Sequence, residues 1–263
     1  MIVIIIVFKI ATWNVNSLKV RLPHVLEWMK KADPDVLALQ ETKSTDDNFP
    51  LDLIEEKGYH VKFVGQKTYN GVATISKSPI EVISTQIPNY NDEQKRVLTI
   101  RVKDIVILNI YVPNGSEIDS EKYKYKLEWF SKLHSFVNDL QKKNDQLIIL
   151  GDFNIAPEDR DVHDPNEWNG GILVSDAERN EFKKLLSHGF VDCFRINNKE
   201  NGNFSWWDYR AASYKRGRGL RIDHILASEK FSEQCLNCYI DKEPRELERP
   251  SDHTPVMAEF NIQ

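Results

Sequence analysis

The feature that most constrains the fold is an apolar run that stops at a glycine and is followed by polar side chains. Residues 147–150 (LIIL) have the length and character of a buried strand, and Gly151 ends it. Asp152 and Asn154 follow two positions apart, so both side chains can lean toward one point at the strand end. Such a pair can hold a metal ion or a water molecule at the mouth of a sheet, and it can equally form a turn by bonding its own backbone.

Strands and helices are interspersed along the rest of the chain. Strands are predicted at residues 2–7, 35–41, 61–65, 72–76, 97–102, 105–112, 147–150, 221–226 and 255–260. Helices are predicted from about residue 22 to 33, from about 120 to 140, and from the capping box at residues 175–178 to Gly189. Because most linkers between strands are too short for parallel crossovers, we expect largely antiparallel or mixed β-sheets flanked by helices, an α/β fold.

Length and cysteine content limit the class of protein. No linker rich in Pro, Gly or Ser divides the 263 residues, so we expect residues 1–263 to form a single domain. The apolar start at residues 2–7 is too short to span a bilayer and lacks the basic lead-in of a signal peptide. Three cysteines favour a reducing compartment, and we expect a cytoplasmic protein without membrane partners. The single Cys235-x-x-Cys238 pair is interpreted as packing rather than as a zinc site.

Positive charge is concentrated in one segment although the net charge is −5. This segment, residues 210–221, contains Arg210, Lys215, Arg216, Arg218 and Arg221. A run of charges is usually a solvated surface. Its position between the Trp206-Trp207 pair and Asp223 favours a loop that contacts phosphates.

Polar side chains close several separate apolar runs. These residues are Asn14, Glu41, Tyr111, Asp152, Asn154, Asp223, Asp252 and His253. Carboxylate and amide oxygens with few histidines suit Mg²⁺ or Mn²⁺ better than zinc. One histidine near carboxylates suits a His–Asp couple, in which the acid fixes the tautomer and supports the imidazolium. The pattern predicts metal-assisted hydrolysis of a phosphate ester.

The segments that carry these residues resemble the exonuclease III family of abasic-site endonucleases. They are WNVNSL, LQETK, YVPNG, GDFNIAPEDRDV, SWWDYR, GLRIDHIL and SDHTPV, in the family's order between residues 8 and 260. GDFN, RID and SDH mark the wider endonuclease/exonuclease/phosphatase superfamily, and the SWWDYR and RGLRID segments narrow the resemblance to DNA repair. It implies a four-layer α/β sandwich, with two stacked sheets inside, helices outside and the active site at one end.

The resemblance also implies roles for individual residues. Glu41 resembles the principal metal ligand, and the other residues at or near the ion are Asn14, Asp152, Asn154 and Asp252. Asp152 resembles the group that activates or orients the attacking water, and Asn154 the group that holds this water or the phosphate. His253 resembles the residue that contacts the scissile phosphate, with Asp223 as its orienting partner. Whether Asp152 or His253 is the base stays open.

Further residues correspond to the family's substrate contacts. Tyr111 and Asn114 resemble phosphate-positioning residues. Trp206, Leu220 and Ile222 match the wall of the pocket that admits a flipped sugar without a base. Arg216 and Arg218 are the expected DNA contacts of the basic segment.

The implied activity is in-line hydrolysis of the phosphodiester 5′ to an abasic site, which leaves a 3′-hydroxyl, together with 3′→5′ exonuclease and 3′-end cleaning. The expected cofactor is Mg²⁺, which Mn²⁺ can replace, and the expected partner is double-stranded DNA with abasic sites or blocked 3′ ends. We expect a monomer without an obligate protein partner. Asn16 stands where the eukaryotic branch has Asp, which fits the bacterial branch and leaves the number of metal ions open. The long apolar start suggests a later start codon.

Two other readings fit parts of the pattern. A secreted nuclease or a phosphatase of sphingolipids or inositol phosphates would share the fold. The former usually relies on disulfides, and the latter would not need SWWDYR or the basic segment. An inactive DNA-binding or scaffold protein would lose some strand-end carboxylates, whereas this chain keeps Glu41, Asp152, Asp223 and Asp252.

Overall fold

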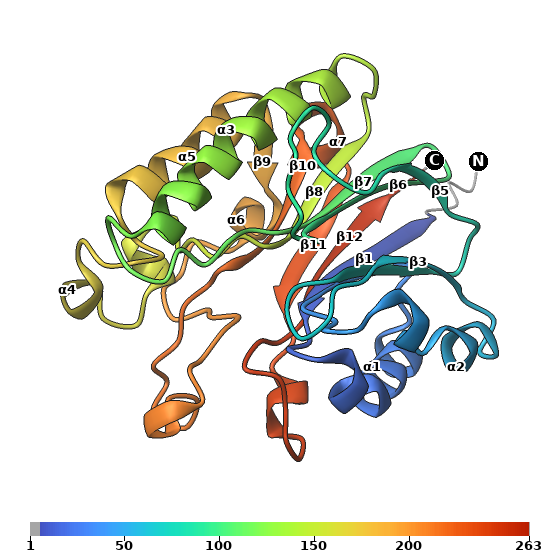
Figure 1. Cartoon of the computed structure of the whole chain (residues 1–263), viewed down its shortest axis with the longest axis horizontal. Coiled ribbons are helices and arrows are strands. Elements are labelled where there is room, and N and C mark those ends of the chain that lie inside the picture. The colour runs from blue at the N-terminus through green and yellow to red at the C-terminus, as the bar shows by residue number, and fades with distance from the viewer. Residues whose placement is uncertain (1–5, 263) are drawn as a thin grey trace.

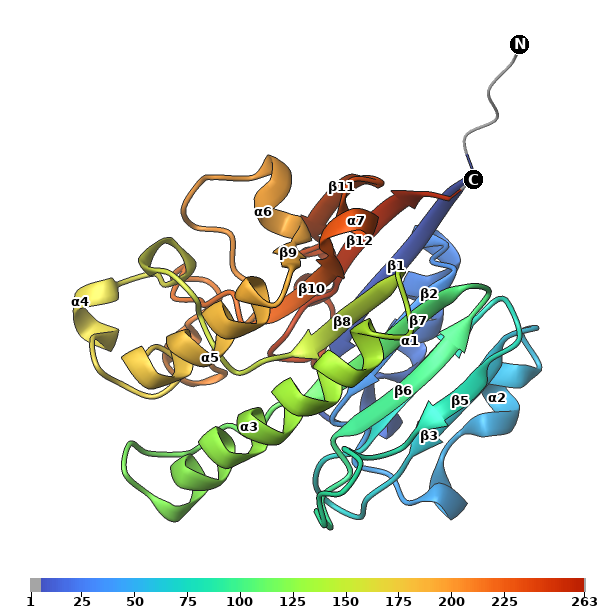
Figure 2. The same ribbon diagram turned by 90° about the horizontal axis from the view of Figure 1, so that it is seen from above.

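The computed structural model describes residues 6–262, and this part of the chain folds into two six-stranded sheets that face each other (Figures 1 and 2). The first sheet has the order β11-β12-β1-β2-β4-β3. Its strands are β1 (Val7–Asn14), β2 (Val36–Gln40), β3 (His60–Val64), β4 (Val72–Ser76), β11 (Cys235–Ile240) and β12 (Val256–Asn261). The second sheet has the order β5-β6-β7-β8-β10-β9. Its strands are β5 (Glu81–Ser84), β6 (Val97–Val102), β7 (Ile105–Tyr111), β8 (Leu147–Asp152), β9 (Phe190–Asp192) and β10 (Asp223–Ser228).

Helices cover the outer faces of the two sheets, so the molecule has four layers (Figure 1). The first sheet is covered by α1 (Leu18–Ala32) and α2 (Leu51–Glu55), and the second by α3 (Glu121–Gln141) and α5 (Asp176–Ser187). Shorter helices are α4 (Pro165–Trp168), α6 (Cys193–Asn197) and α7 (Glu229–Ser232), and 3-10 turns lie at Asp46–Asn48, Asp159–Asp161, Arg210–Ala212 and Glu243–Glu246. No helix within residues 6–262 is long and apolar enough to cross a membrane.

Both sheets are mixed, as expected. The pairs β1–β2 and β7–β8 are parallel, and the other pairs are antiparallel. Each parallel pair is joined by a long helix, α1 or α3, because a parallel connection must cross the whole length of the sheet. The predicted α/β sandwich is therefore confirmed.

The apolar run at the start of β8 is buried on both faces of its sheet. Ile148 and Leu150 point into the core between the two sheets, whereas Leu147 and Ile149 pack into the layer beneath α3 and α5. A strand covered on both faces needs no polar alternation, which explains why residues 147–150 are uniformly apolar.

Most predicted elements are present, with three kinds of difference. The predicted strand at residues 2–7 lies mostly outside the described residues, and β1 begins at Val7. The predicted start of the strand at 221–226 was wrong, because β10 begins at Asp223. The short strands β5, β9 and β11 were not predicted. The capping box is confirmed, since Ser175 Oγ accepts from the Glu178 amide and the Glu178 carboxylate accepts from the Ser175 amide.

The sheet topology brings the chemically important residues to one end of the sandwich. The parallel strands β1, β2, β7 and β8 all finish there. The antiparallel strands β10 and β12 start there, because Asp223 pairs with Asp152 and Val256 pairs with Thr12. Strand ends and strand starts that lie far apart in the sequence therefore share one edge.

Candidate active site

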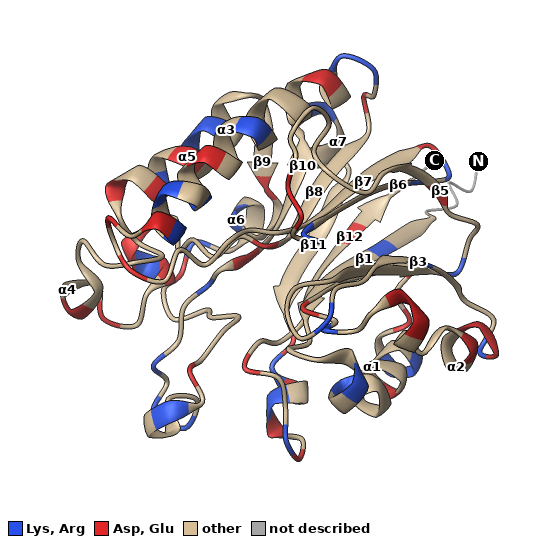
Figure 3. Ribbon diagram, viewed as in Figure 1, with Lys and Arg blue, Asp and Glu red and all other residues tan. Residues whose placement is uncertain are grey.

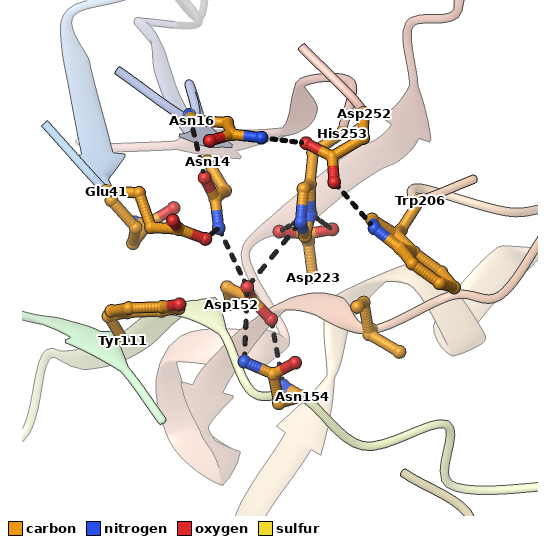
Figure 4. A network of polar contacts seen from close by, with 12 residues as sticks. Asn14, Asn16, Glu41, Tyr111, Asp152, Asn154, Trp206, Asp223, Asp252 and His253 are labelled. Atoms are coloured by element: carbon orange, nitrogen blue, oxygen red, sulfur yellow. Dashed lines mark hydrogen bonds and ion pairs between the residues drawn. The ribbon is translucent and has the colours of Figure 1, made fainter. Parts of the chain in front are cut away.

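Strand pairing places the polar residues of the site next to one another (Figure 4). Asp152, the last residue of β8, is paired with Tyr111 of β7 on one side and with Asp223 of β10 on the other. Asn14 ends β1 opposite Gln40, so that Glu41 follows directly beside it. The register of the two sheets thus brings these side chains together.

His253 and Asp223 form a buried couple. Nδ1 of His253 lies 3.1 Å and 2.9 Å from the two carboxylate oxygens of Asp223, so this nitrogen carries the proton and donates it. Ser205 Oγ donates a second hydrogen bond to Asp223 at 2.6 Å. Nε2 of His253 faces Oδ2 of Asp152 at 3.7 Å. Burial alone lowers the pKa of His253, but the carboxylates of Asp223 and Asp152 outweigh it and raise the pKa to about 10.

Asp152 is almost fully buried at the centre of the site. Its Oδ2 accepts from Nδ2 of Asn14 at 2.9 Å, and its Oδ1 accepts from the backbone amide of Asn154 at 2.9 Å. Burial raises the pKa of Asp152 to about 7, although the cationic His253 opposes this rise. The carboxyl group is therefore poised to exchange a proton near neutral pH.

Glu41, Asp152 and His253 offer ligand atoms that lie within 4.8 Å of one another, the one such group in the described part of the chain. Glu41 stands at the solvent side of this group, and its Oε2 lies 2.9 Å from Nζ of Lys43. Two carboxylates at the mouth of a sheet fit a small hard cation such as Mg²⁺. His253 fits this role less well, because its protonated ring is held by Asp223 and has no free lone pair.

Two residues predicted as metal ligands are turned differently from expectation. Oδ1 of Asn14 accepts from the backbone amide of Asn16, so its Nδ2 is the atom that faces the carboxylates of Glu41 and Asp152. The oxygens of Asp252 accept from Nδ2 of Asn16 and from Nε1 of Trp206. In this arrangement Asn14 and Asp252 are hydrogen-bond partners around the group formed by Glu41, Asp152 and His253.

Asn114 and Asn154 form a second polar group next to Asp152. Nδ2 of Asn114 donates to Oδ1 of Asn154 at 3.0 Å, and Nδ2 of Asn154 donates to the carbonyl oxygen of Val112 at 2.9 Å. The side-chain oxygen of Asn154 thus accepts from Asn114 and its backbone oxygen accepts from Lys126, so neither oxygen is turned toward the carboxylates of the metal group.

Tyr111 lies beside this group. Its ring is covered by the guanidinium of Arg96, whose Cζ lies 4.6 Å from the ring centre. Burial and the carboxylate of Glu41 raise the pKa of Tyr111 well above its usual value, so the phenol keeps its proton. A pocket of about 510 Å³ opens next to Glu41, Arg96, Tyr111 and Asn114. Sequence reasoning missed Arg96 because it lies before β6, far from any recognisable motif.

The predicted wall of the sugar pocket is mostly buried. Trp206 is partly exposed, and its ring stands edge-on to Trp168 with 6.4 Å between the ring centres. Leu220 is 0% exposed and Ile222 1%, and both pack into an apolar cluster beneath Trp206. Leu220 and Ile222 expose almost no side-chain surface here, so Trp206 is the part of the predicted wall that is open to solvent. Trp207, which follows, is a buried core aromatic.

The basic segment contains two kinds of residues. Arg216 and Arg218 are exposed on a loop that projects from the end of the sandwich that carries the site (Figure 3). Arg221 is buried and forms ion pairs with Asp161 at 2.6 Å and with Asp192 at 2.8 Å. Its assignment to a phosphate-contacting surface was therefore wrong. The loop is tied to the neighbouring β11–β12 loop, because Tyr214 Oη donates to Glu246 at 2.6 Å.

Comparison with known proteins agrees with the geometry. Residues 11–253 match the model of the endonuclease/exonuclease/phosphatase family. The chain is 37% identical to exodeoxyribonuclease III of Haemophilus influenzae, covering 96% of this chain and 99% of the relative. A solved structure of a 3′ phosphatase from Neisseria, bound to a product DNA hairpin, is 44% identical with a TM-score of 0.95 and covers 97% of this chain and 100% of that one. An AP endonuclease from Archaeoglobus fulgidus is 40% identical with a TM-score of 0.90 over 97% of this chain and 100% of that one. The chain therefore belongs to the endonuclease/exonuclease/phosphatase family, and within it to the exonuclease III family.

Proposed function

We propose that this protein is a metal-dependent DNA repair nuclease. It hydrolyses the phosphodiester 5′ to an abasic site in double-stranded DNA and leaves a 3′-hydroxyl, and it also removes nucleotides and blocking groups from 3′ ends. The observation that carries the proposal is the buried His253–Asp223 couple, which faces Asp152 at 3.7 Å beside the carboxylate of Glu41. Asp152 is the base in this arrangement, His253 is the positively charged imidazolium, and Glu41 is the carboxylate that binds the metal.

In this proposal Asp152 takes a proton from the attacking water. Burial raises the pKa of Asp152, which makes its carboxylate a stronger proton acceptor than an exposed one. His253 is already protonated and is held by Asp223, so it presents its Nε2–H to a phosphate oxygen rather than accepting a proton. This difference in protonation favours Asp152 over His253 as the base.

Neutral donors complete the contacts to the phosphate. The phenol of Tyr111 keeps its proton and can donate it in a hydrogen bond. The amides of Asn114 and Asn154 are locked together and hold the water or the phosphate at the opposite side of Asp152. Fixed donors of this kind stabilise charge that develops in the transition state without having to reorganise.

The metal would be held by the carboxylate of Glu41, with that of Asp152 close by. Mg²⁺, or Mn²⁺ in its place, supplies positive charge that stabilises the phosphate oxygens and the leaving oxygen. Lys43 lies beside Glu41 and balances part of its negative charge.

The wider setting of the protein is part of the proposal. We propose a monomer without an obligate protein partner, and a single domain, because residues from both sheets of one sandwich make up the site. The three cysteines are free, which supports a reducing compartment such as the bacterial cytoplasm. Arg216 and Arg218, exposed on the projecting loop, are suited to contact DNA phosphates.

The first test is cleavage of an end-labelled duplex that contains one synthetic abasic site, with Mg²⁺ or with EDTA, next to an undamaged duplex and a duplex with a 3′-phosphate. A Mg²⁺-dependent cut 5′ to the abasic site supports the proposal, and release of the 3′-phosphate supports 3′-end cleaning. Binding without cleavage would point to an inactive DNA-binding protein. Neither binding nor cleavage would direct attention to phosphorylated lipids.

A further inference from the structure

A lysine with no exposed side-chain surface lies beneath the active site. Lys126 is part of α3, where its neighbours Lys122 and Lys124 are exposed, and its own side chain is 0% exposed. Burial of an ammonium group is costly unless every donor is satisfied and the charge is balanced. The surroundings of Lys126 therefore have to account for its position.

The three N–H groups of the Lys126 ammonium each meet an acceptor. They donate to the backbone carbonyl of Asn154 at 2.7 Å, to the backbone carbonyl of Asn114 at 3.2 Å and to Oε1 of Glu178 at 2.5 Å. Glu178 is also 0% exposed, so it balances the charge inside the protein. Two of the three acceptors thus belong to the residues whose side-chain amides pair at the active site.

Glu178 is itself fixed by the start of α5. Its carboxylate accepts from the amides of Leu173 and Ser175 and from the hydroxyl of Ser175. The hydroxyl of Tyr123, on α3, lies 2.6 Å from that of Ser175. Helices α3 and α5, which lie side by side over the second sheet (Figure 1), therefore hold the ammonium group rigidly against the two loops.

Both loops turn sharply where they meet Lys126. Asn154 has a positive φ of 49°, a left-handed conformation that asparagine adopts more readily than most residues with a side chain. Gly115, which follows Asn114, has a positive φ of 92° and faces the Lys126 chain: an added Cβ would lie 3.3 Å from Lys126 Cδ. The loops carry Asn114 and Asn154 toward the site, while their carbonyls point back to the ammonium.

We propose that Lys126 is a positioning residue, which aligns the Asn114–Asn154 amide pair for catalysis by holding the backbone carbonyls of both residues. The inference rests on the proposed nuclease function. It extends the functional machinery to a buried ion pair that touches neither the phosphate nor the metal group.

The test separates positioning from simple stability by restoring charge balance. In Lys126→Met, Glu178 is left as an unpaired buried charge, and thermal unfolding should occur at a markedly lower temperature. In the double variant Lys126→Met/Glu178→Gln no unpaired charge is left at this position, so the unfolding temperature should recover most of the loss. Lys124→Met, on the same helix but exposed, is the control for loss of a lysine and should match the wild type.

The kinetic result decides between the two roles. If Lys126 positions the amides, kcat of the double variant stays at least about tenfold below wild type on the abasic duplex, while KM and DNA affinity change little. If Lys126 only stabilises the fold, kcat recovers together with the unfolding temperature, and the proposal is overturned.

A second measurement does not depend on nuclease activity. In a crystal structure of the double variant, the contact between Asn114 Nδ2 and Asn154 Oδ1, 3.0 Å in the wild type, should be lengthened or lost. An unchanged contact would overturn the positioning role. An inactive wild-type protein would instead refute the nuclease function, and the structural result would still decide whether Lys126 holds the pair.

Discussion

Nδ1 of His253 lies 2.9 Å from Oδ2 of Asp223, and this contact fixes which face of the imidazole ring is turned toward the site. Because Nδ1 donates to the carboxylate, Nε2 is the atom that faces Asp152. The contact also makes the imidazolium the stable form of the ring, since Asp223 raises its pKa. Orientation and charge of His253 thus have one common cause.

Replacement of Asp223 tests whether its carboxylate sets the orientation and the charge of His253. Asp223→Asn removes the negative charge that supports the imidazolium and no longer enforces the tautomer, so kcat should fall by at least about two orders of magnitude. Folding and DNA affinity should change little, because the amide has nearly the same shape as the carboxylate. Single-turnover cleavage, fluorescence anisotropy with labelled DNA and thermal unfolding measure the three quantities. Asp145→Asn, an exposed carboxylate, is the matched control, and wild-type turnover in Asp223→Asn would remove the couple from the mechanism.

Metal binding should distinguish Glu41 from Asp252. Glu41→Gln removes the carboxylate at the solvent side of the metal group and should abolish measurable Mg²⁺ binding in isothermal titration. Asp252 is engaged by Asn16 and Trp206, so Asp252→Asn should weaken Mg²⁺ binding by no more than about 10–100-fold. EDTA should stop cleavage by the wild type and leave DNA binding in place. Equal losses of Mg²⁺ affinity in both variants would show that Asp252 is a direct ligand.

The sequence predicted the location of the site better than the direction of its side chains. Strand ends could be read from the chain because apolar runs such as residues 147–150 stop at polar residues. Asn14 is turned by a local contact with the Asn16 amide, two residues later. Asp252 is turned by Asn16 and Trp206, which lie 236 and 46 residues away, and no local pattern encodes these contacts.

Other features of the structure could not be predicted because they depend on contacts between residues far apart in the sequence. Arg221 belongs to a basic segment, but Asp161, 60 residues earlier, draws it into the interior. The edge strand β5 is short, and its pairing with β6 has a register shift between Val82 and Ser84, so its residues show no clear alternation. Lys126 looks like any other lysine of a helix surface, and only the fold reveals its burial.

Substitutions of Leu220, inside the apolar cluster, and of Trp206, at its exposed edge, should change different properties of the protein. Leu220→Ala creates a cavity in this cluster and should lower the free energy of unfolding by about 2–5 kcal/mol. Trp206→Ala removes the partly exposed ring and should reduce the preference for abasic over undamaged duplex more strongly than it reduces stability. Denaturant unfolding and paired cleavage assays measure these effects. A stable Leu220→Ala variant that has lost abasic discrimination would show that Leu220 reaches the substrate after all.

A buried neutral histidine should make stability depend on pH. Nε2 of His224 lies 2.9 Å from the carbonyl oxygen of Ile155 and donates to it, and Nδ1 accepts from Arg221 at 3.0 Å, so both nitrogens are engaged in the neutral form. Burial, followed by the positive charge of Arg221, lowers the pKa of His224 from 6.5 to about 4.

Between these two values the unfolded chain binds a proton at this residue and the folded chain does not, so the free energy of unfolding should fall as the pH is lowered from 6.5 to 4. The full contribution of this one group is about 3 kcal/mol. Urea unfolding at several pH values measures it, and His224→Gln should show a flatter dependence over this window than the wild type. His60→Gln, at an exposed position, should keep the slope of the wild type. Parallel slopes for the wild type and His224→Gln would show that His224 takes up a proton equally in both states.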